Sequence, residues 1–232
     1  NYFFGLMDYE QSLEYNFKAL RVLERICVPK DILFSITCGN ISELYIKLGK
    51  LEEAQDFSEK SLDVSLLNHS QYSIAMSLTN LGLLHEKQAH YQKALNKHKK
   101  ALGYLYQIFP NKNHVRIANT HQNIGNVHLM MEEVKDAQFH YEKALNIREK
   151  DYLEGNGNYL YLIELYNGMG QVFEIKNDLN QSLKYYSRAF DIGFNKSQKI
   201  CEKPLFLISI YNKIAKIKLK QKQYGQALSN IS

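Results

Sequence analysis

Apolar residues recur along this chain at the spacing of one helix face, in two runs separated by a short polar break. Leu78, Leu81 and Leu84 lie three positions apart, the break follows at residues 87–90, and a second amphipathic run begins at Tyr91. Spacings of three and four residues are typical of a half-buried helix, and the break is long enough only for a turn. The pattern therefore predicts a helix, a tight turn and a second helix.

The same pattern returns along the whole chain, marked by small residues seven positions apart. The steps between successive copies are 42, 40, 43, 45 and 45 residues, and the small residues are Ser12/Ala19, Ala54/Ser61, Ala94/Ala101, Ala137/Ala144, Ser182/Ala189 and the single Ala227. A fixed period of this size is the signature of a solenoid built from one repeated supersecondary unit. We therefore predict an all-α solenoid of antiparallel helix pairs with a period of about 40–45 residues.

The repeats divide the chain without leaving room for a second kind of domain. We expect one solenoid domain over residues 1–232, made of a partial repeat at 1–28, repeats at about 32–67, 72–108, 115–152 and 158–195, and a partial repeat at 205–232. The last copy is expected to turn before Tyr224 and begin its second helix there. Because neither end carries a polar cap, we expect the chain to be a fragment of a longer protein.

Small side chains are also expected where the two helices of a repeat approach each other. A large residue there would push the helix axes beyond the usual separation of about 8–10 Å. On the first helices these positions are Ser42, Gly82, Gly125, Gly170 and Ala215, and on the second helices they are Ala54, Ala94, Ala137, Ser182 and Ala227. Glycine within a helix costs about 1 kcal/mol relative to alanine, so its recurrence at equivalent places indicates packing.

The pattern Asn-Leu-Gly, then Tyr-x-x-Ala, then Ala-Leu resembles the tetratricopeptide repeat. Its longer period, together with the segments 75–85, 118–125 and 144–150, resembles the kinesin light chain type of that family. The resemblance covers essentially the whole chain. It implies a right-handed superhelical solenoid that acts as a scaffold or adaptor and binds a peptide or protein in a concave groove lined by the first helices.

Asparagine is the most regular residue on the expected groove face. Asn40, Asn80 and Asn123 each lie two positions before the small packing residue, and in the next repeats asparagine comes one position earlier, at Asn167 and Asn212. An amide side chain both donates and accepts hydrogen bonds, so such a ladder could hold the main chain of an extended peptide. In the alternative interpretation, these amides bond within the solenoid or face water.

The candidate groove residues follow from this frame. They are Asn40, Met76, Asn80, Leu83, Asn119, Asn123, Asn126, Met130, Asn167 and Gln171. Lys213, Lys216 and Lys220 form a candidate basic patch for an acidic peptide or phosphate, and the alternative is a solvated helix face. Met76, Leu83 and Met130 would offer adaptable apolar contacts to a partner.

Composition and motifs favour binding over catalysis. Lys and Arg number 29 against 24 Asp and Glu, an excess too small to indicate nucleic acid. The three cysteines, Cys27, Cys38 and Cys201, form no paired motif, which favours a reducing, intracellular compartment. The eight histidines have no metal-binding spacing, and no phosphate-binding loop or catalytic group of residues is recognisable. We expect no enzyme activity, no metal, no cofactor, no small-molecule substrate and no membrane insertion.

The leading hypothesis is a cytoplasmic scaffold, with a cytoskeletal or ciliary association as one form of it. Two alternatives remain open from the sequence: a structural subunit of a large cytoskeletal or axonemal assembly, and a peptide-sensing regulatory module. Nucleic-acid binding through the terminal lysines is the weakest hypothesis, and it would require an affinity that falls steeply with salt.

Overall fold

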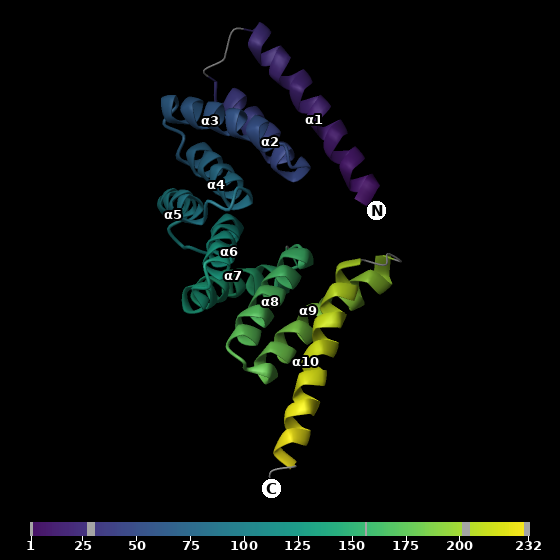
Figure 1. Ribbon diagram of the computed structural model, residues 1–232. Helices are drawn as coiled ribbons and strands as arrows, with labels where there is room; N and C mark the ends of the chain where they lie inside the picture. The colour runs from purple at the N-terminus through teal and green to yellow at the C-terminus, as the bar shows by residue number, and fades with distance from the viewer. Residues whose placement is uncertain (1, 27–30, 156, 201–204, 230–232) are drawn as a thin grey trace. The chain divides into compact units, whose positions relative to one another are not determined.

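The computed structural model describes residues 2–26, 31–155, 157–200 and 205–229 and confirms the all-α prediction. These residues contain no strand and form ten helices: α1 (Tyr2–Arg25), α2 (Ile32–Leu48), α3 (Leu51–Leu67), α4 (Gln71–Lys87), α5 (Tyr91–Ile108), α6 (Val115–Met130), α7 (Val134–Leu153), α8 (Tyr159–Ile175), α9 (Leu179–Ile200) and α10 (Leu205–Ser229) (Figure 1). Cys27, Cys201 and Lys203 lie outside the described residues, as do the side chains of Tyr224 and Ala227.

The helices form two compact units, Asn1–Val127 and His128–Ser232, with the boundary inside α6. In the first unit α2 packs on α3 and α4 packs on α5, while α3 also packs on α4 and α1 on α2. In the second unit α8 packs on α7 and α9, and α9 packs on α10. Each unit therefore buries its apolar surface between consecutive antiparallel helices, as a repeat architecture requires.

The turn inside each helix pair contains a residue in the left-handed backbone region, two positions before the second helix begins. These residues are Gly49 (φ 76°), Ala89 (φ 57°), Glu132 (φ 62°) and Asn177 (φ 58°). Glycine and asparagine adopt this conformation readily, whereas alanine and glutamate do so at a cost of roughly 1–2 kcal/mol. The helix packing on either side of the turn must therefore offset that cost.

One sequence prediction about these turns is wrong. We expected a turn before Tyr224, but α10 continues without interruption from Leu205 to Ser229. Lys222 occupies the position where the other turns have their left-handed residue, and it lies between Gln221 and Gln223. All three are good helix formers, so the local sequence favours continuing the helix.

The small residues of the repeats are buried as predicted in α3, α5, α7 and α9. At most 3% of each residue is exposed, for Ala54, Ser61, Ala94, Ala101, Ala137, Ala144, Ser182 and Ala189. In α1 the pattern does not hold, because Ala19 is exposed. Instead, α1 packs on the α2 residues Cys38 and Ile41 through Leu20, supported by Leu13 and Phe17.

The predicted contact between residues twelve positions apart is present in both units. The Ser42 hydroxyl on α2 donates to the Ala54 carbonyl on α3 (3.0 Å). In the second unit the Ser182 hydroxyl on α9 donates to the Gly170 carbonyl on α8 (2.9 Å). A hydroxyl that reaches the facing backbone requires the two helices to lie close together.

A second contact, between residues sixteen positions apart, was not predicted. The His98 ring lies where a Cβ atom of Gly82 would be, 2.4 Å from the ideal Cβ position, and the Tyr186 ring lies 2.5 Å from that of Gly170. In the first repeat, Ser42 replaces the glycine and Ser58 replaces the ring, and the two hydroxyls are hydrogen-bonded. The sizes of the two facing residues are therefore complementary. A ring on the second helix requires glycine on the first helix, whereas a serine on the second helix allows a serine on the first.

Buried serines join three helices of the first unit. The Ser61 hydroxyl on α3 donates to the Ser35 carbonyl on α2 (2.9 Å) and lies 2.7 Å from the Ser77 hydroxyl on α4. The Ser35 hydroxyl in turn reaches the Ser61 carbonyl (3.0 Å). Because each of these buried hydroxyls has a partner, the polar core carries no large desolvation cost.

Two titratable groups in the first unit are strongly perturbed by burial. His98 is fully buried, and within the described part of the chain neither ring nitrogen has a hydrogen-bond partner. Burial lowers the pKa of His98 to about 4, because a charged imidazole there would lose its hydration. Burial likewise raises the pKa of the Cys38 thiol to about 11, so the thiol stays protonated at neutral pH and Cys38 is a packing residue.

Replacing Gly82 by alanine should destabilise the first unit by about 1–3 kcal/mol, because the new methyl group would overlap the buried His98 ring. The matched control is Gly103→Ala on the exposed face of α5, where no atom lies within 4 Å of the new Cβ. That control should be neutral or stabilise by about 0.5–1 kcal/mol. Urea denaturation followed by circular dichroism measures both; equal effects of the two substitutions would contradict the packing interpretation.

Acidification should destabilise the first unit through His98. Its pKa is lowered on folding, from 6.5 to about 4, so the unfolded chain binds the proton first and stability falls as the pH drops below about 6.5. Between about pH 7 and pH 5 the loss from this group is about 2 kcal/mol. His98→Phe keeps a ring over Gly82, as Tyr186 does over Gly170, and should remove that part of the pH dependence in urea denaturation. An unchanged pH dependence would contradict this origin.

Candidate functional site

The predicted groove residue Asn80 joins two first helices of the first unit. Its side chain is 9% exposed, and its amide nitrogen donates to the Gly39 carbonyl on α2 (2.8 Å). Asn40, the next residue on α2, is exposed. Asn80 therefore links α4 to α2 within the unit. Its second amide hydrogen and its carbonyl oxygen remain for other contacts.

The two predicted apolar groove residues of α4 differ in their surroundings. Leu83 is half-buried and packs on the core cluster of Ile46, Ala54, Leu81 and Leu84, so it contributes to the packing of α2, α3 and α4. Met76 is also half-buried, on the same helix as Asn80. A partner protein would therefore contact only the exposed part of the Met76 and Leu83 side chains.

The predicted asparagines of α6 are all half-buried. Asn119 and Asn126 each interact with a neighbouring group. Asn123 lies between them along the helix, and the described residues give it no hydrogen bond. His121, on the same helix, forms a 2.8 Å hydrogen bond with the Tyr106 hydroxyl of α5. Met130 lies in the second unit, at the end of α6, and is 57% exposed.

In the second unit, two predicted residues from successive first helices are in direct contact. The Lys213 ammonium of α10 donates to the Asn167 carbonyl oxygen of α8 (2.8 Å) and lies 5.3 Å from the centre of the Tyr186 ring. Burial lowers the pKa of Lys213, and the nearby Glu174 carboxylate partly offsets this effect. Gln171, one helical turn beyond Asn167, is half-buried on α8.

The shift of asparagine by one position in this repeat has a steric reason. Gly168 occupies the place that Asn80 and Asn123 hold in the earlier repeats, and it is buried. The Tyr141 ring lies 2.9 Å from the ideal Cβ position of Gly168. A side chain at 168 would meet that ring, so asparagine fits only at position 167.

Lysines and one carboxylate surround this contact. The Lys216 and Lys220 ammonium groups lie 3.8 Å and 3.6 Å from a Glu174 oxygen, and the Tyr186 hydroxyl donates to the other oxygen (3.1 Å). Glu174 thus faces three lysines, counting Lys213. The local charge remains positive by two, and the predicted basic patch is a connected group of side chains on α8, α9 and α10.

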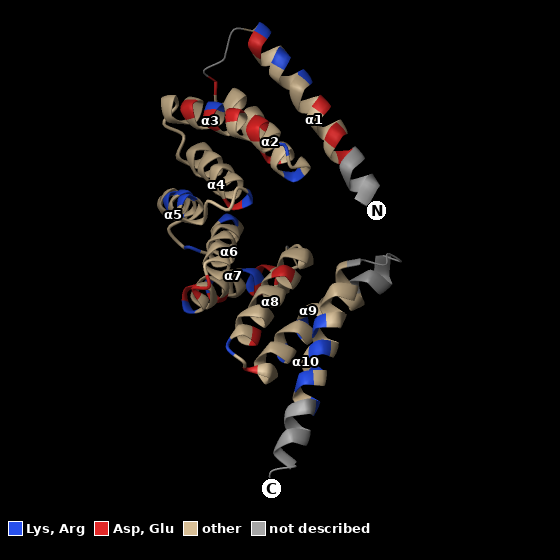
Figure 2. Cartoon of the chain, viewed as in Figure 1, with Lys and Arg blue, Asp and Glu red and all other residues tan. Residues whose placement is uncertain are grey.

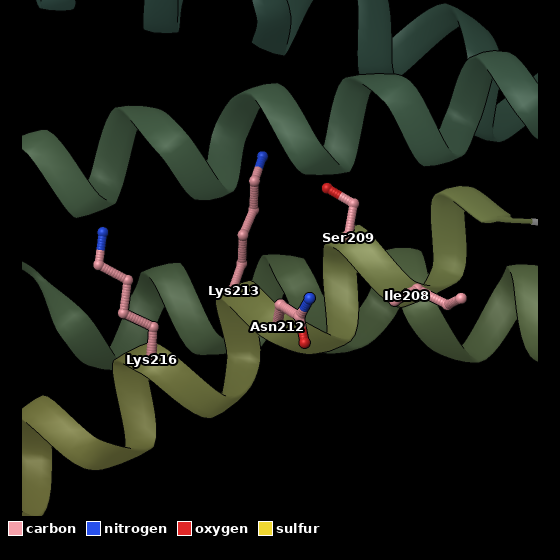
Figure 3. A pocket seen from close by; sticks show the side chains of 5 residues that line it. All are labelled: Ile208, Ser209, Asn212, Lys213 and Lys216. Atoms are coloured by element: carbon pink, nitrogen blue, oxygen red, sulfur yellow. The ribbon is translucent and has the colours of Figure 1, made fainter.

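A shallow pocket lies beside Lys213 on α10. It has a volume of about 510 Å³ and is lined by Ile208, Ser209, Asn212, Lys213 and Lys216. Figure 3 shows Ser209, Lys213 and Lys216 extending from α10 to the same side. Ile208 is 59% exposed at its edge. The pocket therefore combines cations, neutral hydrogen-bonding groups and one apolar side chain.

A cluster that the sequence did not predict lies at the turn between α6 and α7. His128 Nδ1, Glu133 and Asp136 place ligand atoms within 4.8 Å of one another, a spacing that a metal ion could use. The acids come from the next helix, so no spacing along one helix indicates them. Glu133 is the N-cap of α7 and Asp136 lies in its first turn, where the helix dipole favours carboxylates and opposes a cation. The 2.5 Å contact of His128 with Glu133 ties α6 to α7, so we assign the cluster a structural role.

Comparison with known proteins confirms the resemblance found in the sequence. Residues 32–107 match the tetratricopeptide repeat family. Protein kinesin light chain-related 2 of Arabidopsis thaliana is 23% identical over 193 residues, which cover 79% of this chain and 28% of that protein. The chain thus spans little more than a quarter of that relative's length.

Solved structures share the fold. The crystal structure of BtubC (BKLC) from P. vanneervenii superposes with a TM-score of 0.69 at 21% identity, covering 85% of this chain and 76% of that one. PilF of Pseudomonas aeruginosa superposes with a TM-score of 0.57 at 16% identity, covering 94% and 88%. The chain therefore has the all-α fold of tetratricopeptide repeat proteins. Its sequence is similar to that of kinesin light chain-related proteins.

Within the described ranges, no helix combines the length and the apolar character needed to cross a bilayer.

Two asparagines of the predicted ladder should differ in their effect on stability. Asn80→Ala removes the hydrogen bond to the Gly39 carbonyl and should cost about 0.5–1.5 kcal/mol of unfolding free energy. Asn123→Ala, which removes no such bond, should change stability by less than about 0.5 kcal/mol. Urea denaturation of the two variants compares them. A larger loss for Asn123→Ala than for Asn80→Ala would contradict the assigned contacts.

Proposed function

We propose that this chain, whose residues 32–107 are tetratricopeptide repeats, is a protein-interaction scaffold that holds an extended segment of a partner protein along its first helices. The observation that carries the proposal is the contact between Lys213 and Asn167. It brings a predicted groove residue of α8 and a lysine of the predicted basic patch on α10 together beside an open pocket. A bridge of this kind between successive first helices is what a continuous binding surface needs.

The charge around Lys213 favours an acidic partner segment. Its ammonium is held by a neutral amide, whereas a carboxylate would neutralise it. Half-buried and already partly dehydrated, it gains from a carboxylate more than a fully hydrated surface lysine would. The exposed Ile208 at the pocket edge adds an apolar contact. The proposed ligand is therefore an acidic segment with an apolar residue next to its carboxylate.

In the first unit, the proposed contacts are to the partner's main chain. Asn123 and the remaining donor and acceptor of Asn80 are amide groups on first helices, which can pair with peptide groups whatever the partner's sequence. Met76 lies on the same helix as Asn80 and would contact apolar side chains of the partner. Binding in this unit would thus depend less on the partner's sequence than binding near Lys213.

A cytoskeletal setting is part of the proposal. Protein kinesin light chain-related 2 is a relative of this chain, and the sequence resemblance points to the same type. We extend this to an adaptor role in which the repeats hold one protein of a cytoskeletal complex.

Site-specific photo-crosslinking tests where the partner binds. A photoreactive residue at Asn212, beside the pocket, should capture partner proteins from the source cells, and the control at the exposed Asn146 of α7 should not. Lys213→Met keeps the aliphatic stem but removes the charge, and should weaken binding of the captured partner about ten-fold, the size of one charge-assisted hydrogen bond. The same proteins captured from both positions, with unchanged affinity for Lys213→Met, would contradict the groove proposal.

A further inference from the structure

Two second helices of the first unit carry opposite charge. Helix α3 contains five carboxylates and one lysine, a net of four negative charges. Helix α5 contains four lysines and no carboxylate, a net of four positive charges, because its buried His98 is neutral. Figure 2 shows red positions along α3 and blue positions on α5. The net charge of the whole chain, +5, does not reveal this separation.

The charges form stripes with the same spacing and direction. On α3 the stripe is Glu52, Asp56, Glu59 and Asp63, and on α5 it is Lys93, Lys97 and Lys100. Steps of four and three residues keep each stripe on one helix face, over about 16 Å on α3 and about 10 Å on α5. Helices α3 and α5 are both second helices, with α4 packed between them, and their axes are inclined to each other (Figure 1). The first three acids of the α3 stripe can therefore each face one lysine of the α5 stripe when two such helices lie parallel.

These side chains are available for an intermolecular contact. All seven are exposed, except that Lys97 is half-buried. Within the residues that the structure describes, none of the seven forms an ion pair. Helix α3 packs on α2 and α4, and α5 packs on α4, through their opposite, apolar faces. The stripes thus face outward and are not neutralised by neighbouring side chains.

We infer that a second copy of this chain docks on α3 and α5, so that the acidic stripe of each copy faces the lysine stripe of the other. A two-fold axis that passes outside the surface, midway between α3 and α5 and along the bisector of their directions, places each α3 parallel to the partner's α5. Both stripes are then matched at once, which is the property of an isologous interface.

A second copy fits these charges better than a nucleic acid or another polyanion does. A polyanion bound along the lysines of α5 would be repelled by the carboxylates of α3 in the same unit. Only a surface with both signs in the reverse order satisfies both helices, and this chain itself carries such a surface. The association is independent of the groove on the first helices, since it uses only second helices.

Surface ion pairs are individually weak and are screened by salt, so the dimer should be weak and salt-sensitive. Sedimentation velocity of the 232-residue chain should show a concentration-dependent dimer at about 20 mM NaCl and a monomer at about 0.5 M, where the Debye length falls from about 20 Å to about 4 Å.

Charge reversal locates the interface. The triple variants Lys93→Glu/Lys97→Glu/Lys100→Glu and Glu52→Lys/Asp56→Lys/Glu59→Lys should each be monomeric at low salt, and an equimolar mixture should form a heterodimer. The control Lys135→Glu/Lys143→Glu/Lys150→Glu on α7 changes the net charge equally and should dimerise as the unmodified chain does. Circular dichroism verifies the folding of every variant.

Three results would overturn the inference. One is a chain that stays monomeric at low salt and high concentration, and another is a mixture of folded reversal variants that fails to associate. The third is a monomeric chain that binds heparin or polyglutamate through the α5 lysines, which would assign the stripe to an anionic partner.

Discussion

The close approach of the two helices in each repeat is the constraint on which the rest of the structure depends. It is made by short side chains at positions twelve apart, where the Ser42 and Ser182 hydroxyls reach the facing backbone. It is completed sixteen positions along, where a ring such as Tyr186 lies directly on a backbone without a Cβ. Because this packing holds the helix pair, it also imposes left-handed turns on residues such as Ala89 that do not favour them.

The same packing places the candidate binding residues. Gly168 must be glycine because of the Tyr141 ring, which moves the asparagine to position 167, within reach of Lys213. In the first unit, Asn80 serves the packing itself by bonding to Gly39. Side chains of the first helices that we propose for binding thus also contribute to packing, whereas the exposed faces of the second helices are free to carry charge patterns such as those of α3 and α5.

Much of the fold was predictable from the sequence because each structural position recurs in several repeats, so its residue type can be compared between them. The small residues at 54, 94, 137 and 182 and the polar break at 87–90 identified the helix pairs correctly. The partner of each glycine was not predictable, since the sixteen-residue contact involves serine, histidine or tyrosine in different repeats. The turn expected before Tyr224 was wrong because nothing in the sequence from 221 to 223 stops a helix. For the site, the repeat spacing assigned Asn80, Asn167 and Lys213 to first helices. Only the three-dimensional contacts show which of their side chains form hydrogen bonds within a unit.

A double-mutant cycle at positions 82 and 98 tests the central claim most directly. Gly82→Ser and His98→Ser are measured singly and together, so that the double variant carries the Ser42/Ser58 pair of the first repeat. If the side chains at these positions must be complementary in size, Gly82→Ser should strongly lower the free energy of unfolding while the His98 ring is present. The double variant should recover most of that loss, which corresponds to a coupling energy of about 1–3 kcal/mol. Additive losses in urea denaturation would contradict the account.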